Sequence, residues 1–180
     1  MQYTKIDNVL DTHLLEYMYN KYCTVAATDY TSNNFFYAPA TLNGTLPEWH
    51  IQQMDKSDRM AVLASLQDGR RFKGFKHFHR ANINIHKMSA GTSIATHKDP
   101  CVLSITVCLT GDYAGGEFNE LDEQGNVLNS MWLGKNSACV YYDPSTYNSP
   151  PHSVNTITEG NRITLQIFVP GDQHKRVDLC

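Results

Sequence analysis

Residues 81–170 contain several short runs of strand-forming residues, two of which alternate apolar and polar side chains, and this pattern favours a mainly-β fold. Ile83 and Ile85 alternate with polar residues in ANINIHKM (81–88). LSITVCLT (103–110), SACVYYD (137–143) and RITLQIFVP (162–170) are further runs, and an EQGN turn between GGEFNEL and VLNSMWL predicts a hairpin. Many strands at short spacing are typical of a sandwich or a jelly roll.

Two helices are predicted before these strands. DTHLLEYMYNKYC (11–23) places Leu14, Leu15, Met18 and Tyr22 at helical spacing, and Asp11 is a suitable N-cap. A second helix is predicted over about 57–68, with Ser57 as its cap and with Met60, Leu63 and Leu66 inside. Residues 24–50 are interpreted as loops and short strands. We therefore expect a single domain over 1–180, mainly β, with helical support at about 8–70 and a barrel core at about 80–170.

Composition and charge narrow the class of partner. The chain has 180 residues, of which 41% are hydrophobic, and this suits one domain with a sizeable core. A formal net charge of −3 argues against a broad basic surface, so nucleic-acid binding is not expected. The local basic cluster of Arg70, Arg71, Lys73 and KHFHR (76–80) is interpreted as a solvated loop.

The cysteines and the hydropathy pattern indicate where the protein is expected to act. No apolar run is long enough to span a membrane, and MQYTKIDNVL lacks the apolar region of a signal peptide. The five cysteines are odd in number and include no CxxC pair, so they are interpreted as reduced thiols. We expect a cytoplasmic protein.

The segment after residue 93 carries a histidine and a carboxylate with metal-ligand spacing. His97 and Asp99 are two residues apart, so both side chains leave the same face of an extended chain. Pro100 disfavours the helical conformation for Asp99. The two side chains can occupy adjacent positions on one metal ion, and a second histidine would complete the set of two histidines and one carboxylate found in non-haem Fe(II) oxygenases.

A second histidine and an arginine follow later in the sequence, at a spacing that would let them face one cavity. His152 precedes Arg162 by ten residues, which allows a turn and a return strand, and Thr164 follows on the same face as Arg162. An arginine that points into a sheet interior needs an anion, and its planar fork matches a carboxylate.

Together these pieces resemble the prolyl 4-hydroxylase-like branch of the 2-oxoglutarate- and Fe(II)-dependent dioxygenases. The resemblance rests on Gly91-x5-His97-x-Asp99, GGEF (115–118), KNSACVYY (135–142) and His152-x9-Arg162-x-Thr164, and covers roughly residues 80–170. It implies a double-stranded β-helix, or jelly roll, of the cupin-like kind. It also implies Fe(II) bound by His97, Asp99 and His152, 2-oxoglutarate held by Arg162 and Thr164, and O₂ split between succinate and a hydroxylated product.

The sequence departs from the family pattern at three positions. Met88 stands where many relatives have a tyrosine, Thr106 or Cys108 replaces a second tyrosine facing the pocket, and Arg162 replaces the usual lysine of prolyl 4-hydroxylases. The presence of Asp99 argues against the halogenating branch, which needs that ligand position for halide. The departures leave the metal ligands in place but bear on the substrate.

The substrate is expected to be a prolyl residue in a peptide, with a free amino acid, a nucleobase or another small metabolite as alternatives. The aromatic residues Tyr30, Phe35, Phe36 and Tyr37 would either form one wall of a peptide groove or cover the outside of a sheet. A different class of function is a non-catalytic, cupin-like metal-binding module. The oligomeric state is left open.

Several further residues have two interpretations. His86 is either a structural histidine or part of the substrate pocket, and the segment PSTYNSPP (144–151) is either a lid or a plain connection. The acidic residues Glu117, Glu120, Asp122 and Glu123 are predicted to lie on solvated faces.

Overall fold

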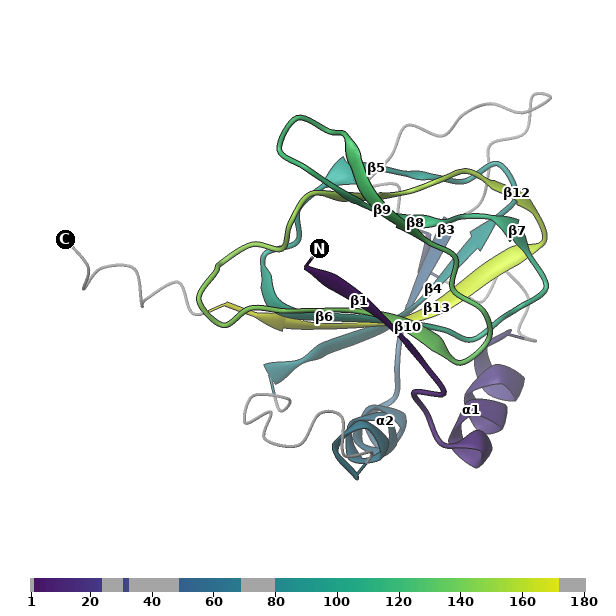
Figure 1. The fold of residues 1–180 in the computed structure, drawn as a ribbon. Helices are drawn as coiled ribbons and strands as arrows, with labels where there is room; N and C mark the ends of the chain where they lie inside the picture. The colour runs from purple at the N-terminus through teal and green to yellow at the C-terminus, as the bar shows by residue number, and fades with distance from the viewer. Residues whose placement is uncertain (1, 24–30, 33–48, 69–79, 172–180) are drawn as a thin grey trace.

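A computed structural model describes residues 2–23, 31–32, 49–68 and 80–171, which form two facing antiparallel sheets with helices on one side (Figure 1). The large sheet has the order β1-β10-β6-β13-β4-β3-β2, and the smaller sheet has the order β5-β11-β8-β9. A two-stranded sheet, β12-β7, adjoins them. The strands are β1 (Tyr3–Asp7), β2 (Thr31–Ser32), β3 (Trp49–Gln53), β4 (Asn82–Ser89), β5 (Ile94–His97), β6 (Cys101–Cys108), β7 (Ala114–Gly115), β8 (Phe118–Leu121), β9 (Val127–Met131), β10 (Ser137–Tyr142), β11 (His152–Val154), β12 (Ile157–Glu159) and β13 (Asn161–Pro170).

The alternation in the sequence separates the two faces of the large sheet. On β6 and β13, residues such as Ile105 and Ile167 pack toward the helices, in one core cluster with Leu15 of the first helix and Leu66 of the second. The intervening residues face the smaller sheet and form a second cluster around Phe118 and its neighbours. Because that inner face also carries polar side chains, the space between the sheets is where a site can form. The predicted mainly-β architecture with helices on one sheet is confirmed.

The helices α1 (Thr12–Met18) and α2 (Lys56–Asp68) lie together beneath the large sheet (Figure 1). Asp11 caps α1 by accepting a hydrogen bond of 3.0 Å from the Leu14 N–H, as predicted. The predicted helix over 11–23 continues past α1 as a π-helical turn, η1 (Tyr19–Cys23). The buried carboxylate of Asp58 in α2 joins the two elements, accepting hydrogen bonds from Lys21 Nζ and Tyr22 Oη.

Two details of the second helix differ from the prediction. Ser57 is not the cap, because α2 already begins at Lys56. Met60 was expected inside but is 60% exposed, whereas Val62, Leu63 and Leu66 are buried. The buried face is centred on Val62, and a residue two positions away lies about 200° around a helix of 3.6 residues per turn, on the solvent side.

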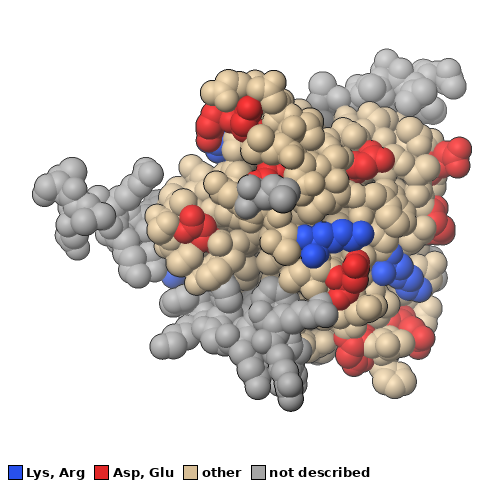
Figure 2. All heavy atoms as spheres, in the orientation of Figure 1, with Lys and Arg blue, Asp and Glu red and all other residues tan. Residues whose placement is uncertain are grey.

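Charged side chains are mixed rather than grouped on the face of the molecule shown in Figure 2. The described Lys and Arg side chains there lie beside Asp and Glu side chains. Among the described residues, no helix has both the length and the apolar character required to cross a membrane. The four described cysteines, Cys23, Cys101, Cys108 and Cys139, are free thiols.

Candidate metal and anion site

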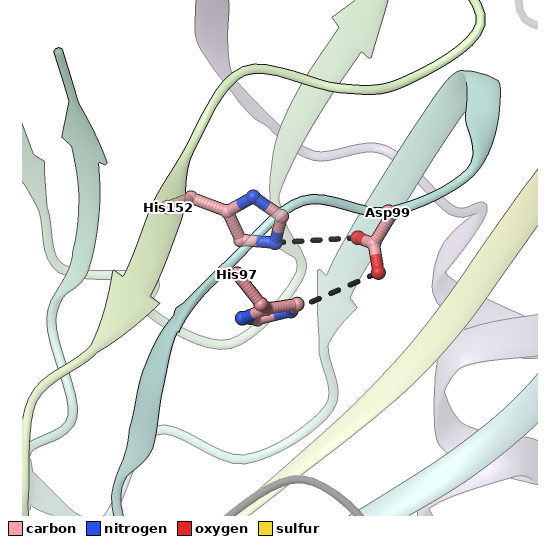
Figure 3. Close-up of side chains that lie close together, drawn as sticks. All are labelled: His97, Asp99 and His152. Atoms are coloured by element: carbon pink, nitrogen blue, oxygen red, sulfur yellow. Dashed lines mark ion pairs between the residues drawn. The ribbon is translucent and has the colours of Figure 1, made fainter. Parts of the chain in front are cut away.

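His97 and His152 lie directly opposite each other on neighbouring antiparallel strands, β5 and β11. Asp99 follows two residues after the end of β5 and turns its carboxylate toward both rings (Figure 3). His152 Nε2 lies 3.2 Å from Asp99 Oδ2, and His97 Nε2 lies 3.7 Å from Asp99 Oδ1. One ligand atom from each residue falls within 4.8 Å of the other two, so the three residues predicted from the sequence are brought together in a cluster that suits one metal ion.

The two histidines are oriented by the same device. The Nδ1 atom of each ring lies against the carbonyl oxygen two residues earlier, Ala95 O at 2.9 Å for His97 and Pro150 O at 3.0 Å for His152. A carbonyl can only accept a hydrogen bond, so these contacts favour a proton on Nδ1. The Nε2 lone pair of each ring is then directed toward the space beside Asp99, as metal binding requires.

The three side chains of the cluster are largely shielded from solvent. Side-chain exposure is 6% for His152, 25% for His97 and 21% for Asp99. Burial, and after it the neighbouring His152, lowers the pKa of His97 below its ordinary value, so this imidazole stays neutral near pH 7. Phe118 stacks on the His152 ring at a centroid distance of 5.1 Å and covers its apolar side.

The cluster opens into a cavity of about 90 Å³ between the two sheets. That volume holds several waters or a small organic anion. Its wall combines apolar side chains, among them Phe118 and Phe168, with polar side chains from β4, β6 and β13. His86 lines this cavity, which favours the second of the two interpretations made from the sequence.

Arg162 lines the same cavity and is fully buried, with 0% exposure. Its Nη1 contacts the Met88 thioether at 3.8 Å, whereas Nε and Nη2 have no hydrogen-bond partner among the described residues. A buried guanidinium without an anion is costly, so this arrangement suits a ligand that carries a carboxylate or a phosphate. Met88, at the position of the expected family tyrosine, therefore borders the anion site.

The double glycine of the GGEF motif makes room for this arginine. A Cβ atom at Gly116 would lie 3.2 Å from Arg162 Cδ and 3.0 Å from Ile157 Cγ1. Gly115 has φ +71°, and a Cβ there would meet the Thr156 carbonyl oxygen at 2.3 Å. Gly116, with φ +68°, therefore leaves room for Arg162, whereas Gly115 is required by the close approach of the Thr156 backbone.

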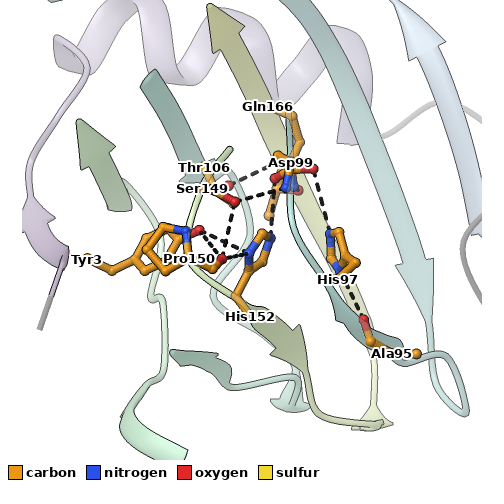
Figure 4. Close-up of polar contacts among 10 residues, drawn as sticks. Tyr3, Ala95, His97, Asp99, Thr106, Ser149, Pro150, His152 and Gln166 are labelled. Atoms are coloured by element: carbon orange, nitrogen blue, oxygen red, sulfur yellow. Dashed lines mark hydrogen bonds and ion pairs between the residues drawn. The ribbon is translucent and has the colours of Figure 1, made fainter. Parts of the chain in front are cut away.

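A chain of polar side chains runs from β6 to β13 beside the anion site. Thr106 donates to Gln166 Oε1 at 3.1 Å, and Gln166 Nε2 donates to Thr164 Oγ1 at 3.3 Å (the first of these contacts is drawn in Figure 4). Thr106 and Gln166 line the cavity, while Thr164 is fully buried. Cys108, the alternative to Thr106, is buried and directs its thiol to the Thr110 carbonyl.

Four residues at or near the site were not identified from the sequence. Gln166 shares the face of Arg162 and Thr164, so the period of two that placed Thr164 would also have placed Gln166. Ser104 shares the face of Thr106 in the same way and lines the cavity. Tyr3 and Ser149 carry no such signal, because each contacts a site residue that is distant from it in the sequence, His152 for Tyr3 and Asp99 for Ser149.

One prediction about the acidic residues was wrong. Glu120 was expected on a solvated face but is buried, with 1% exposure, and Oε1 accepts a hydrogen bond of 2.5 Å from the Gln2 N–H. Glu120 pairs with His152 across β8 and β11, and the chain reaches it there through Gln2, directly before β1.

Some expectations fall on parts of the chain outside the described residues. These are the aromatic wall of Tyr30, Phe35, Phe36 and Tyr37, and the basic cluster at 70–80, of which only Arg80 is described.

Among the comparisons with known proteins, only the one with solved structures found matches. No family model matches the chain, and no curated protein matches it. Among solved structures, a 2OG-Fe(II) oxygenase family oxidoreductase from Burkholderia pseudomallei is similar over 93% of this chain and 84% of its own, at 17% identity and a TM-score of 0.64.

Two prolyl hydroxylase structures are similar to a comparable degree. A Pseudomonas putida prolyl-4-hydroxylase matches 95% of this chain and 93% of its own, at 13% identity and a TM-score of 0.61. The viral collagen prolyl hydroxylase of Paramecium Bursaria Chlorella virus-1, in complex with 2OG, matches 93% of this chain and 95% of its own, at 15% identity and a TM-score of 0.60.

These likenesses establish the class of fold. The chain has the double-stranded β-helix fold of the 2-oxoglutarate- and Fe(II)-dependent oxygenases, as the sequence predicted. Prolyl 4-hydroxylases are among the structures that share this fold with it over most of both chains.

Proposed function

We propose that the protein is an Fe(II)- and 2-oxoglutarate-dependent oxygenase that hydroxylates a C–H bond. The observation that carries this proposal is the presence, in one cavity, of the cluster of His97, Asp99 and His152 and of the buried Arg162 with two unpaired nitrogens. The first suits a divalent iron, and the second suits the distal carboxylate of a dicarboxylate co-substrate.

The residues fit both groups. His97 and His152 would bind Fe(II) through Nε2 while their Nδ1 protons stay on backbone carbonyls, and Asp99 would supply a carboxylate oxygen. Arg162 would bind the distal carboxylate of 2-oxoglutarate, with the Thr164 hydroxyl in support. When both groups are bound, a site of this kind supplies hydroxylation by O₂, with one oxygen atom going to succinate and the other to the product.

The protein's own part is to bind, to orient and to exclude water. Phe118, Phe168 and other apolar side chains shield the space beside the ligands. Thr106 and Gln166 offer a hydroxyl and an amide to a bound polar molecule. A buried arginine without a carboxylate partner among the described residues also disfavours the alternative of a metal-binding module without turnover.

For the substrate we propose a prolyl residue in a peptide, supported by the prolyl hydroxylases among the similar structures. The alternatives are a free amino acid, a nucleobase or another small metabolite.

A succinate-release assay tests the proposal. Purified protein is incubated with Fe(II), 2-oxoglutarate and O₂, and with proline-rich peptides, free amino acids or nucleosides, and products are examined by mass spectrometry. Succinate with a gain of one oxygen on a peptide is expected. Asp99→Ala is the inactive control, and His13→Ala, on the exposed face of α1, is the matched active control. Turnover only on non-peptide pools would remove the prolyl substrate, and succinate production unaffected by Asp99→Ala would remove the oxygenase proposal.

A further inference from the structure

We infer that Tyr3 is a positioning residue for the metal ligand His152, so that the N-terminal strand β1 is part of the metal site. This inference rests on the proposed function, because it assigns a hydrogen-bond partner to His152, one of the residues proposed to bind iron. Tyr3 Oη lies 2.9 Å from His152 Nδ1, and the two residues are 149 positions apart in the sequence (Figure 4).

His152 Nδ1, the Tyr3 hydroxyl and the Pro150 carbonyl lie within hydrogen-bond distance of one another. With metal on Nε2, the ring must carry its proton on Nδ1. That proton faces both Pro150 O at 3.0 Å and Tyr3 Oη at 2.9 Å, and the Tyr3 hydroxyl can in turn donate to Pro150 O at 3.5 Å. Tyr3 therefore holds the imidazole and the carbonyl that orients it. His97 has its own carbonyl, Ala95 O, at 2.9 Å from its Nδ1.

The Tyr3 ring is fixed tightly enough to act in this way. It is buried and packs edge-on against Phe118 at 4.7 Å and beside Tyr141 at 5.4 Å. Phe118 in turn stacks on His152, so the imidazole is confined on one side by a ring and at Nδ1 by a hydroxyl. Burial raises the pKa of the Tyr3 phenol above its ordinary value, and the hydroxyl keeps its proton near neutral pH.

Strand β1 is held in register on either side of Tyr3. Its backbone pairs with β10 from Tyr3 to Asp7, and the Gln2 N–H donates to the buried carboxylate of Glu120 on β8. Glu120 lies opposite His152 in the β8–β11 ladder. Strand β1 is therefore paired with the large sheet, and the residue before it is hydrogen-bonded to β8, the neighbour of β11.

Tyr3→Phe tests this inference, because it removes the hydroxyl and keeps the ring that packs on Phe118. Tyr141→Phe is the matched control: it removes a buried hydroxyl from the same aromatic group, but that hydroxyl contacts Thr146 and the Asn148 carbonyl rather than a ligand. The readouts are the Kd for Co²⁺, followed by the visible absorption of the bound ion under anaerobic conditions, and the melting temperature of the metal-free protein.

Tyr3→Phe is expected to raise the Kd for Co²⁺ by about tenfold, at the lower end of the effect of second-layer partners because Pro150 O remains, and to alter the Co²⁺ spectrum. Tyr141→Phe should leave both unchanged. A Tyr3→Phe protein with the wild-type Kd and spectrum would overturn the inference and leave the proposed function intact. Wild-type protein that binds no Co²⁺, or that binds it equally well after Asp99→Ala, would overturn the proposed function and this inference with it.

Discussion

Ser149 and Asp99 exchange two hydrogen bonds across fifty residues of sequence. The Asp99 N–H donates to Ser149 Oγ at 2.9 Å, and the Ser149 N–H donates to the Asp99 carbonyl at 2.8 Å. Ser149 is buried, and Pro150 directly after it supplies the carbonyl that orients His152. The end of the segment 144–151 is therefore fixed to the residues of the candidate metal site, which argues against free movement of that end as a lid.

We predict that Ser149→Ala weakens metal binding. The change leaves the Asp99 N–H without its acceptor, a loss of about 1–3 kcal/mol if the group stays buried, and loosens the turn that presents the carboxylate. The Kd for Co²⁺ should rise several-fold. Ser145→Ala, in the same segment, is the control because its hydroxyl bonds only locally to Asp143. An equal effect of both substitutions would mean that the segment matters and the Ser149–Asp99 pair does not.

Arg162→Met should separate stability from co-substrate binding. Removing a fully buried charge that has two unpaired nitrogens is expected to leave the free energy of unfolding unchanged or to raise it by about 1–4 kcal/mol. The same change should abolish the rise in melting temperature that 2-oxoglutarate gives the wild-type protein, while Co²⁺ still binds. Thermal shift with and without 2-oxoglutarate checks both. A variant still stabilised by 2-oxoglutarate would place the anion elsewhere.

Ile105→Ala should destabilise the fold without altering the site. Ile105 is fully buried on the helix-facing side of β6, between Val140 and Ile167 of the flanking strands, so truncation is expected to cost about 2–5 kcal/mol. Urea unfolding measures this cost, and Met60→Ala on the exposed side of α2 should stay within about 0.5 kcal/mol of wild type. The Kd for Co²⁺ well below the unfolding transition should match wild type, and a large change would show that the two faces of the sheet are coupled.

The buried His86 is expected to make the stability of the metal-free protein depend on pH. Burial, and after it the charge of Arg162, lowers the pKa of His86 from 6.5 to about 3 in the folded state. Between these two values the unfolded chain binds a proton that the folded chain does not, so stability falls as the pH falls, by about 1.4 kcal/mol per pH unit for one proton.

Urea unfolding of wild type and His86→Gln at pH 4, 5, 6 and 7 tests this expectation. The difference in unfolding free energy between the two proteins should shift in favour of the variant as the pH is lowered below about 6.5. A difference that stays constant with pH would contradict the assigned pKa. His13→Ala, at an exposed position on α1, should follow the wild-type profile.

Local patterns in the sequence were sufficient for the parts of the site that one strand presents by itself. His97 and Asp99 share a face because of a period of two, and the same period links Arg162, Thr164 and Gln166. The grouping of His152 with these two residues was implied by the family resemblance, which rested on the order and spacing of the motifs together. The alternation also distinguished the helix-facing residues of β6 and β13 from those that line the cavity.

The contributions of Tyr3 and Glu120 depend on how distant segments pair, and that of Ser149 depends on a contact between two loops; local patterns encode neither. YTKID gives no strong strand signal, and its place beside β10 follows from tertiary pairing. The sequence around Glu120 predicts a surface carboxylate, because nothing local indicates that the distant Gln2 supplies a donor to it. The placement of Met60 failed for a different reason, because the buried face of α2 is centred on Val62. The division of the chain into one domain with support at 8–70 and a core at 80–170 stays a prediction.

The contact between Tyr3 and His152 also sets a time scale for assembly. At synthesis rates of about 5–20 residues per second, the 149 positions between them take roughly 7–30 s to translate. For most of that interval β1 lacks its partner strand β10, and pairings so far apart in sequence pay the loop-closure entropy before they gain any contact. The proposed ligand set also cannot be complete before His152 is translated, so a nascent chain that meets iron earlier would offer it only His97 and Asp99.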